Sequence, residues 1–249
     1  MTFRPVRIKK PLLVLDSTGT PPLYRRMFPR HQLEVDPAWC RLQAKVVQIC
    51  DQSMPLATLK SKQKLKQVQK LVTAIIKQRK PVRGVLVVAR RDVLKRMTLP
   101  GSVQQIYYGA QRGSRKFEKC HTVILVGAAE PGPEQIAAQA EALLHRPVSR
   151  TRRDQERAYA YPSSPGKSYG TQVKVYPHAL HQALLERVRE GEMTQAAYRI
   201  RPLESKPDGM VFVLSSLPLD LLPPDELLPL EELRDRFDQS GSERSGRVH

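Results

Sequence analysis

Residues 84–126 have the sequence GVLVVARRDVLKRMTLPGSVQQIYYGAQRGSRKFEKCHTVILV, in which three short apolar runs alternate with polar segments. The runs at 84–89 and 122–126 are almost wholly apolar, which is typical of parallel strands buried on both faces. The run at 103–108 is a third candidate strand. These three runs predict an α/β fold with a mostly parallel sheet.

The rest of the chain extends this pattern on both sides. Further strands are expected at 11–16, 43–50 and 210–215, and a β-hairpin at 158–161 and 172–176. Helical spacing predicts helices at 23–28, 56–80, 133–145, 177–190, 192–199 and 225–233. We therefore expect one domain over residues 1–236 and a disordered polar tail over 237–249.

The charge of the chain is high and unevenly distributed. The formal net charge is +18, and residues 1–120 hold 26 Lys and Arg against 6 Asp and Glu. Residues 121–249 are nearly neutral, with 16 basic and 18 acidic residues. A basic half of this kind indicates an anionic partner, most often nucleic acid, and we expect DNA rather than RNA.

Composition also excludes several classes of protein. No apolar run is long enough for a membrane span or for the core of a signal peptide. The three cysteines, Cys40, Cys50 and Cys120, are odd in number and lack metal-like spacing, so a disulfide scaffold or a zinc site is not expected. We expect a cytoplasmic protein without a membrane partner.

A lysine stripe on the expected helix 56–80 is the first candidate binding surface. Lys62, Lys66 and Lys70 stand at i, i+4 and i+8, so they share one helix face. The stripe is either an ordinary solvated surface or a surface that faces phosphates, and the sequence leaves both interpretations open.

The segment 108–117 combines glycines, cations and an aromatic ring. Glycine permits close approach of a backbone, cations meet phosphates, and an aromatic ring can stack on a base. The alternative is a basic surface turn. The residues concerned are Gly109, Arg112, Gly113, Arg115, Lys116 and Phe117.

The segment 194–202 carries a third candidate group of residues. Gln195 and Arg199 are four apart and share a helix face, and Arg201 follows where Pro202 ends the helix. A guanidinium at a helix end can reach the phosphate of a neighbouring domain, and its planar fork suits phosphoryl oxygens. Taken alone, the spacing is also that of an ordinary surface helix.

Two weaker motifs concern phosphate and metal binding. Residues 165–168, PGKS, end like a P-loop, but Tyr161 stands where the first glycine is required, so we expect no ATP hydrolysis by this chain alone. His178 and His181 are at i and i+3 without an evident third ligand, which favours a surface pair over a metal site.

Ligands of parallel α/β sheets gather beyond the carboxyl ends of the strands. This rule draws attention to the loops after Asp16, Tyr108 and Val126. Asp16 itself can either bind Mg²⁺ or cap the next turn.

Three of these segments, in this order, resemble the C-terminal half of superfamily-two helicase-like proteins from phages, plasmids and integrated elements. Residues 13–19 (LVLDSTG) resemble the strand-end motif that couples nucleotide and DNA, with Asp16, Ser17 and Thr18 in the key positions. Residues 107–117 resemble the loop that contacts nucleic acid and nucleotide, and residues 195–202 resemble the last motif, Q-x-x-x-R-x-R.

The resemblance spans about residues 10–235 and implies a RecA-like three-layer domain with an inserted hairpin. It implies that Arg199 and Arg201, with Gln195, act on the γ-phosphate of ATP, and that Mg²⁺ and ATP are shared with a P-loop domain. The sequence departs from the family in lacking Walker A and B motifs and in carrying Glu130, where a basic residue is expected. Either a separate chain supplies the ATPase domain, or the protein is a split or decayed helicase half that keeps only nucleic-acid binding. The alternative function is that of a non-enzymatic basic DNA- or RNA-binding accessory protein or a subunit of a nucleoprotein complex.

Overall fold

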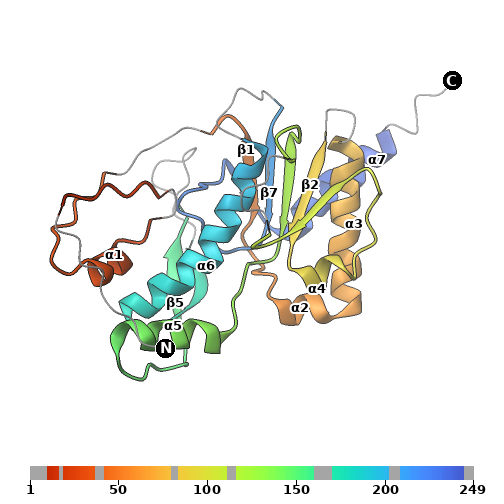
Figure 1. Ribbon diagram of the computed structural model, residues 1–249. Helices are drawn as coiled ribbons and strands as arrows, with labels where there is room; N and C mark the ends of the chain where they lie inside the picture. Colours follow the sequence, from red (N-terminus) through yellow and green to blue (C-terminus); the bar gives the residue numbers. More distant parts are fainter. Residues whose placement is uncertain are drawn as a thin grey trace.

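Six parallel strands form the centre of the computed structural model (Figure 1). It describes residues 10–16, 19–36, 42–79, 84–110, 116–159, 170–201 and 208–243. The order across the sheet is β3-β2-β4-β7-β1-β8, and every neighbouring pair is parallel. The strands are β1 (Lys45–Ile49), β2 (Val85–Ala89), β3 (Gln104–Tyr107), β4 (Thr122–Val126), β7 (Met210–Leu214) and β8 (Glu226–Leu228).

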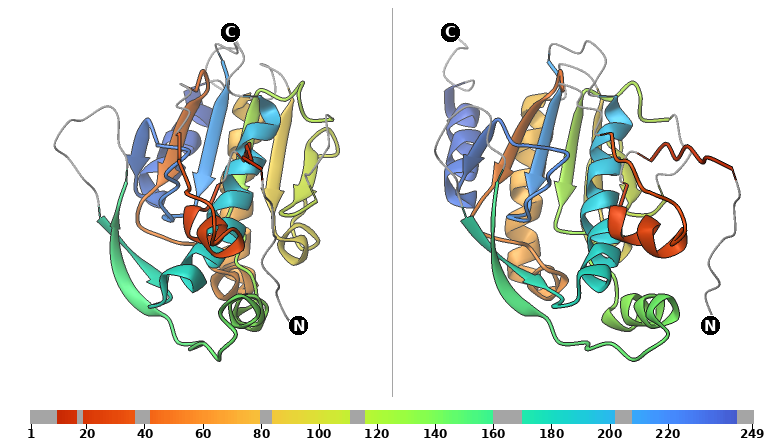
Figure 2. Two further views of the ribbon diagram at one scale, coloured as in Figure 1. Left: turned by 60° about the vertical axis from the view of Figure 1, so that its left-hand side comes forward. Right: turned by 90° about the vertical axis from the view of Figure 1, so that its left-hand side faces the viewer.

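The central strands are apolar on both faces because helices cover both. In β2, Val85 and Val87 enter one buried cluster, whereas Leu86 and Val88 enter the other. The first cluster includes side chains of the helices α2 (Leu56–Lys60), α3 (Lys62–Arg79), α4 (Arg91–Leu94) and α7 (Leu230–Glu243). The helix α6 (Ala179–Ala197) covers the opposite face, so the RecA-like three-layer α/β arrangement is confirmed (Figures 1 and 2).

The expected hairpin is present as a separate two-stranded sheet. Its antiparallel strands are β5 (Arg153–Ala158) and β6 (Gly170–Val175), so the first strand lies earlier than the sequence predicts. The helices α1 (Pro21–Met27) and α5 (Pro133–Leu144) pack with the first half of α6 in a third apolar cluster (Figure 2).

The strand predicted at residues 11–16 is wrong. This segment belongs to no strand, and Leu13 and Leu15 are 81% and 88% exposed. An apolar run of this kind favours burial, but a strand also needs a neighbouring strand with which to form hydrogen bonds. The six-stranded sheet forms without this segment.

Three other boundaries also differ from the predictions. The two helices expected at 177–190 and 192–199 are one helix, α6, continued by a 3₁₀ turn, η1 (Tyr198–Ile200). Packing of this helix on the sheet overrides the helix-weakening effect of Gly191. Residues 226–228 form β8 rather than helix, and α7 (Leu230–Glu243) extends beyond the expected end of the helix at 233. None of the described helices is long and apolar enough to cross a membrane.

Candidate functional site

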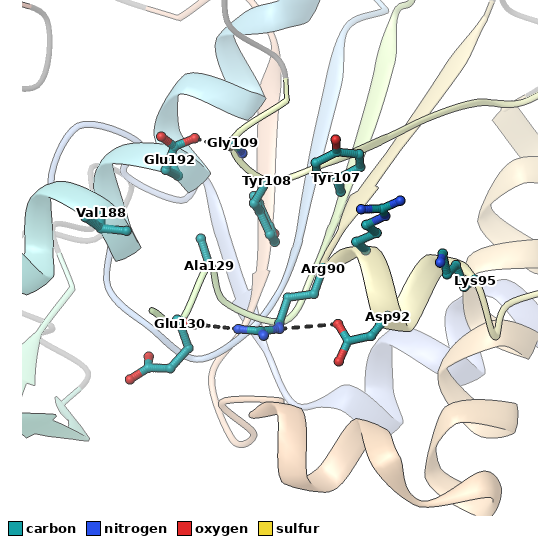
Figure 3. Close-up of a pocket in the computed structure, with 11 residues that line it drawn as sticks. Arg90, Asp92, Lys95, Tyr107, Tyr108, Gly109, Ala129, Glu130, Val188 and Glu192 are labelled. Carbon is teal, nitrogen blue, oxygen red and sulfur yellow. Dashed lines mark hydrogen bonds and ion pairs between the residues drawn. The ribbon is translucent and has the colours of Figure 1, made fainter. Parts of the chain in front are cut away.

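A pocket of about 620 Å³ opens at the carboxyl ends of β2, β3 and β4 (Figure 3). The strand β2 leads to α4 on one face of the sheet, whereas its neighbour β4 leads through α5 and the hairpin to α6 on the other. Adjacent strands whose connections leave to opposite faces create the crevice in which α/β proteins bind ligands. The lining residues are Arg90, Arg91, Asp92, Lys95, Tyr107, Tyr108, Gly109, Ala129, Glu130, Val188 and Glu192.

One side of the pocket is cationic and aromatic. Arg91 and Lys95 are exposed, and neither forms an ion pair with another residue that the structure describes. The guanidinium of Arg91 lies 5.8 Å from the ring centre of Tyr107, and Tyr107 is 42% exposed. Positive charge and an aromatic ring are therefore both accessible to a ligand at this rim.

Arg90 has a different role, although it also lines the pocket. Its guanidinium donates to the carbonyl of Glu130 and, at 3.4 Å, to the carboxylate of Asp92. Figure 3 shows this side chain lying between the two acceptors. Arg90 therefore connects the ends of β2 and β4 and is not free for a ligand.

Tyr108 and Gly109 form the middle of the pocket. The Tyr108 hydroxyl donates to the carbonyl of Gly127 at 2.9 Å, and burial raises the pKa of this phenol, so it remains a neutral donor. Gly109 has a φ of 87°, and a Cβ atom there would meet nothing within 4 Å. Its amide donates to the buried carboxylate of Glu192 at 3.1 Å.

A chain of ion pairs joins the pocket to the hairpin. The carboxylate of Glu130 pairs with Arg152 and, at 3.7 Å, with the buried guanidinium of Arg189. Arg189 also binds Glu190 at 2.8 Å, and Arg157 of β5 reaches the same carboxylate at 3.0 Å. Burial raises the pKa of Glu190 despite these two arginines. The acidic residue at 130, unexpected from the helicase resemblance, is thus a structural acceptor.

The predicted segments 107–117 and 195–202 lie beside each other. Gly109 at the start of the loop is bonded to Glu192 of α6, and Glu118 after the loop pairs with Arg201 at 2.7 Å. Because β3 and β4 are both parallel to β2, Gly109 lies at the carboxyl edge of the sheet and Glu118 at its amino edge, and α6 runs from the first edge toward the second (Figure 1). The pocket and the two arginines therefore lie toward opposite ends of one loop-and-helix surface.

The individual residues of this surface differ in accessibility. Arg199 is half-buried, and its Nε has no hydrogen-bond partner among the described residues. The side chain of Arg201 is 41% exposed and its backbone φ is 50°. Gln195 is half-buried on α6. Lys116 is exposed, whereas Phe117 is only 5% exposed and packs beneath α6, so the prediction that its ring stacks on a base is corrected.

Several predicted site residues lie elsewhere or outside the described residues. Asp16 accepts a hydrogen bond from Tyr24, and its carbonyl accepts from Gly19, so it forms a local turn before α1 rather than a strand end. Lys62, Lys66 and Lys70 are exposed on α3. The residues outside the described part are Ser17, Thr18, Arg112, Gly113 and Arg115, together with the GKS segment 166–168.

The histidine pair is also not a surface pair. His181 is 1% exposed, and its ring stacks on that of Tyr176 with centres 3.5 Å apart. Burial lowers the pKa of His181, and the nearby charge of Arg152 acts in the same direction. Within the described ranges, no three His, Cys, Asp or Glu residues are placed to hold a metal ion.

The strand-end rule, as we applied it to the sequence, predicted two of the loops that line the pocket but not the segment that follows β2. The loops after Tyr108 and Val126 do line the pocket, and the loop after Asp16 does not. Arg90, Arg91 and Lys95 were overlooked, although they follow the apolar run 84–89 directly and satisfy the same rule. Comparison of the chain with family models, with curated proteins and with solved structures finds no match in any of the three.

Proposed function

We propose that this protein is a nucleic-acid-binding domain of the helicase C-terminal type, which supplies arginines to ATP held by a separate chain. The observation that carries the proposal is a pair of contacts between the residues that flank the loop after β3 and the segment 192–201. Gly109 contacts Glu192 at one end, and Glu118 pairs with Arg201 at the other. The loop after β3, which we expect to contact nucleic acid, would then be held against the segment that we expect to contact the nucleotide.

The chain's own contribution to ATP chemistry is limited to guanidinium groups. The Arg199 side chain is half-buried, its Nε has no hydrogen-bond partner among the described residues, and the Arg201 side chain is 41% exposed. We assign both guanidinium groups as donors to an incoming phosphate. ATP and Mg²⁺, bound by the partner, would supply the phosphoryl group and the metal. In this arrangement Arg199 and Arg201 stabilise negative charge on the transferring phosphate, and Gln195 positions them.

The test begins with the partner. The tagged protein is purified from its native host with nuclease treatment, and a near-stoichiometric chain with an intact P-loop is expected. The ATPase rate of that chain is then measured with wild type and with Arg199→Ala and Arg201→Ala. Arginines that act on phosphate contribute about 10³-fold or more, so either variant should abolish the stimulation while nucleic-acid binding is retained.

The ion pair of Arg201 provides a matched control. Glu118→Gln removes the same pair but leaves the guanidinium in place, so it should preserve the stimulation that Arg201→Ala destroys. Arg153→Ala, a change at an exposed arginine of the hairpin, controls for the loss of one positive charge. Equal losses in Glu118→Gln and Arg201→Ala, or normal stimulation by both arginine variants, would contradict the proposed role.

A second candidate function rests on α3. This helix contains no acidic residue, and its lysines at 62, 64, 66, 70 and 77 are all exposed. Such a surface favours a non-enzymatic subunit that holds nucleic acid through phosphate contacts alone. Recovery of nucleic acid without any P-loop chain in the purification would support this candidate over the first.

A further inference from the structure

The pocket at the ends of β2, β3 and β4 has the size and position of a ligand site rather than of a packing gap. Its volume of about 620 Å³ falls within the range of roughly 300–1,000 Å³ that small-molecule sites occupy. It also lies at the point where neighbouring strands diverge to opposite faces of the sheet. Of the candidate site residues predicted from the sequence, only Gly109 is among the residues that line it.

The charges around the pocket select the class of ligand. The charge of Arg90 is engaged by Asp92 and by a carbonyl, whereas Arg91 and Lys95 remain without acidic partners in the described part of the chain. These two cations stand one helical turn apart, at i and i+4, on the same rim. An anionic group is therefore the natural occupant of this side.

The aromatic ring beside these cations indicates more than an isolated anion. Tyr107 ends the edge strand β3, is 42% exposed, and lies within cation–π distance of Arg91. A planar base can stack on such a ring while its phosphate meets the adjacent cations. Inorganic phosphate would use the cations but leave the ring unused.

The backbone at Gly109, which follows Tyr108, permits close approach of a ligand. Gly109 lines the pocket, and the space where its Cβ would lie is open. Glu130 and Glu192 lie across the pocket from Tyr107, with their carboxylates engaged by Arg152 and Arg189 and by the Gly109 amide, so a base on Tyr107 would stand between the cationic and the acidic side of the pocket (Figure 3). A base can reach this position only when it is unstacked from its neighbours and from any complementary strand.

We propose that this pocket binds one nucleotide unit of a single nucleic-acid strand, with the base on Tyr107 and the phosphate on Arg91 and Lys95. The assignment rests on the proposed nucleic-acid-binding function and specifies its substrate as single-stranded. The strand would continue from this unit toward the loop that begins at Gly109.

The test uses a single-stranded oligonucleotide carrying 2-aminopurine, whose fluorescence falls when the base stacks. The wild-type protein should quench the fluorescence saturably and bind the matching duplex more weakly. Tyr107→Ala should reduce affinity about 5- to 150-fold and abolish the quenching, because base–aromatic stacking contributes about 1–3 kcal/mol. Tyr107→Phe should retain both.

Charge variants separate the phosphate contact from stacking. Lys95→Gln should weaken binding and reduce its dependence on salt, yet retain the quenching. Arg153→Gln and Gln104→Ala, which change an exposed residue of the hairpin and one of β3, are the matched controls and should bind like wild type. Thermal unfolding of each variant verifies that the fold is intact.

Each remaining outcome has a definite meaning. Unchanged affinity and quenching in Tyr107→Ala would overturn the assignment while leaving nucleic-acid binding established. Equally tight, Tyr107-dependent binding of duplex would overturn the preference for a single strand. Displacement of the strand by micromolar free AMP would assign the pocket to a mononucleotide instead. No binding of any oligonucleotide by the wild type would contradict the proposed function itself.

Discussion

Gly127 ends β4 with a φ of 66°, a conformation that residues with a side chain rarely adopt. A Cβ atom there would approach the carbonyl oxygen of Met54 to 2.7 Å and Leu59 to 3.0 Å. The small residue therefore allows the segment that begins α2 to pack against the end of β4.

We predict that Gly127→Ala destabilises the protein by more than the roughly 1–2 kcal/mol of left-handed backbone strain alone. Gly109→Ala is the matched control, because its φ is also positive but its surroundings are open. Chemical denaturation of both variants measures the difference. Equal destabilisation would show that the contact with Met54 is not restrictive.

His181 gives stability a dependence on pH. Its pKa is lowered in the folded protein by burial and by the charges of Arg152, His178 and Arg150, while Glu141 opposes them. At pH values between the ordinary pKa of about 6.5 and the lower pKa in the folded protein, His181 is protonated in the unfolded chain but neutral in the folded protein. Its contribution to stability is therefore complete above that range and is lost as pH falls below about 6.5.

We predict that His181→Phe, which retains a ring to stack on Tyr176, flattens this part of the pH profile. The measurement is the free energy of unfolding of both proteins between pH 8 and pH 5. The wild-type value should fall relative to the variant by up to about 1.4 kcal/mol per pH unit. Parallel profiles would mean that His181 titrates alike in both states.

At the scale of elements, the helix α3 shows what a sequence pattern can establish. Its apolar spacing predicts the buried residues correctly, and Leu65, Val68, Val72, Ile75 and Ile76 are all in the core. The same pattern predicts that the lysines are exposed, which is confirmed. It does not indicate whether phosphate binds there.

We predict that reversing the charge of Lys62, Lys66 and Lys70 to Glu weakens nucleic-acid binding only if α3 binds the strand. For each phosphate that α3 no longer binds, the slope of log affinity against log salt should fall by about 0.7 for a single strand. The control is the reversal of Arg146 and Arg153, two exposed arginines outside both candidate surfaces, compared with the reversal of Lys62 and Lys66 alone, which changes the net charge equally. An unchanged slope would remove α3 from the interface.

Other elements show where the sequence was insufficient. The run PLLVLD at 11–16 has the composition of a buried strand, but composition does not specify a partner strand, and the segment remains outside the sheet. The element at 226–228 is only three residues long and is a strand because it pairs with β1, a long-range contact that local propensity does not encode.

At the scale of the whole molecule, strand order creates the candidate site. The apolar runs predict a parallel sheet, and this is confirmed, but they do not predict that β2 and β4 become neighbours. That adjacency brings Arg90 next to Glu130 and forms the pocket. The sequence therefore predicts the loops at strand ends, whereas the combination of three particular loops depends on the topology.

Only the fold shows how the basic half and the nearly neutral half of the chain are arranged in space. Strands from the two halves are interleaved in one sheet, with β1 of the basic half between β7 and β8 of the neutral half, so the halves are not separate units. Among the described residues, exposed cations lie on the rim of the pocket, at Arg91 and Lys95, and along α3, at its lysines.

The most direct test of nucleic-acid binding is an equilibrium titration of a labelled 20-nucleotide single strand with the purified protein at several salt concentrations. We predict saturable binding whose logarithmic affinity falls linearly with the logarithm of salt, as counterions leave the phosphates. Absence of binding at low salt, or an affinity independent of salt, would contradict the proposed function.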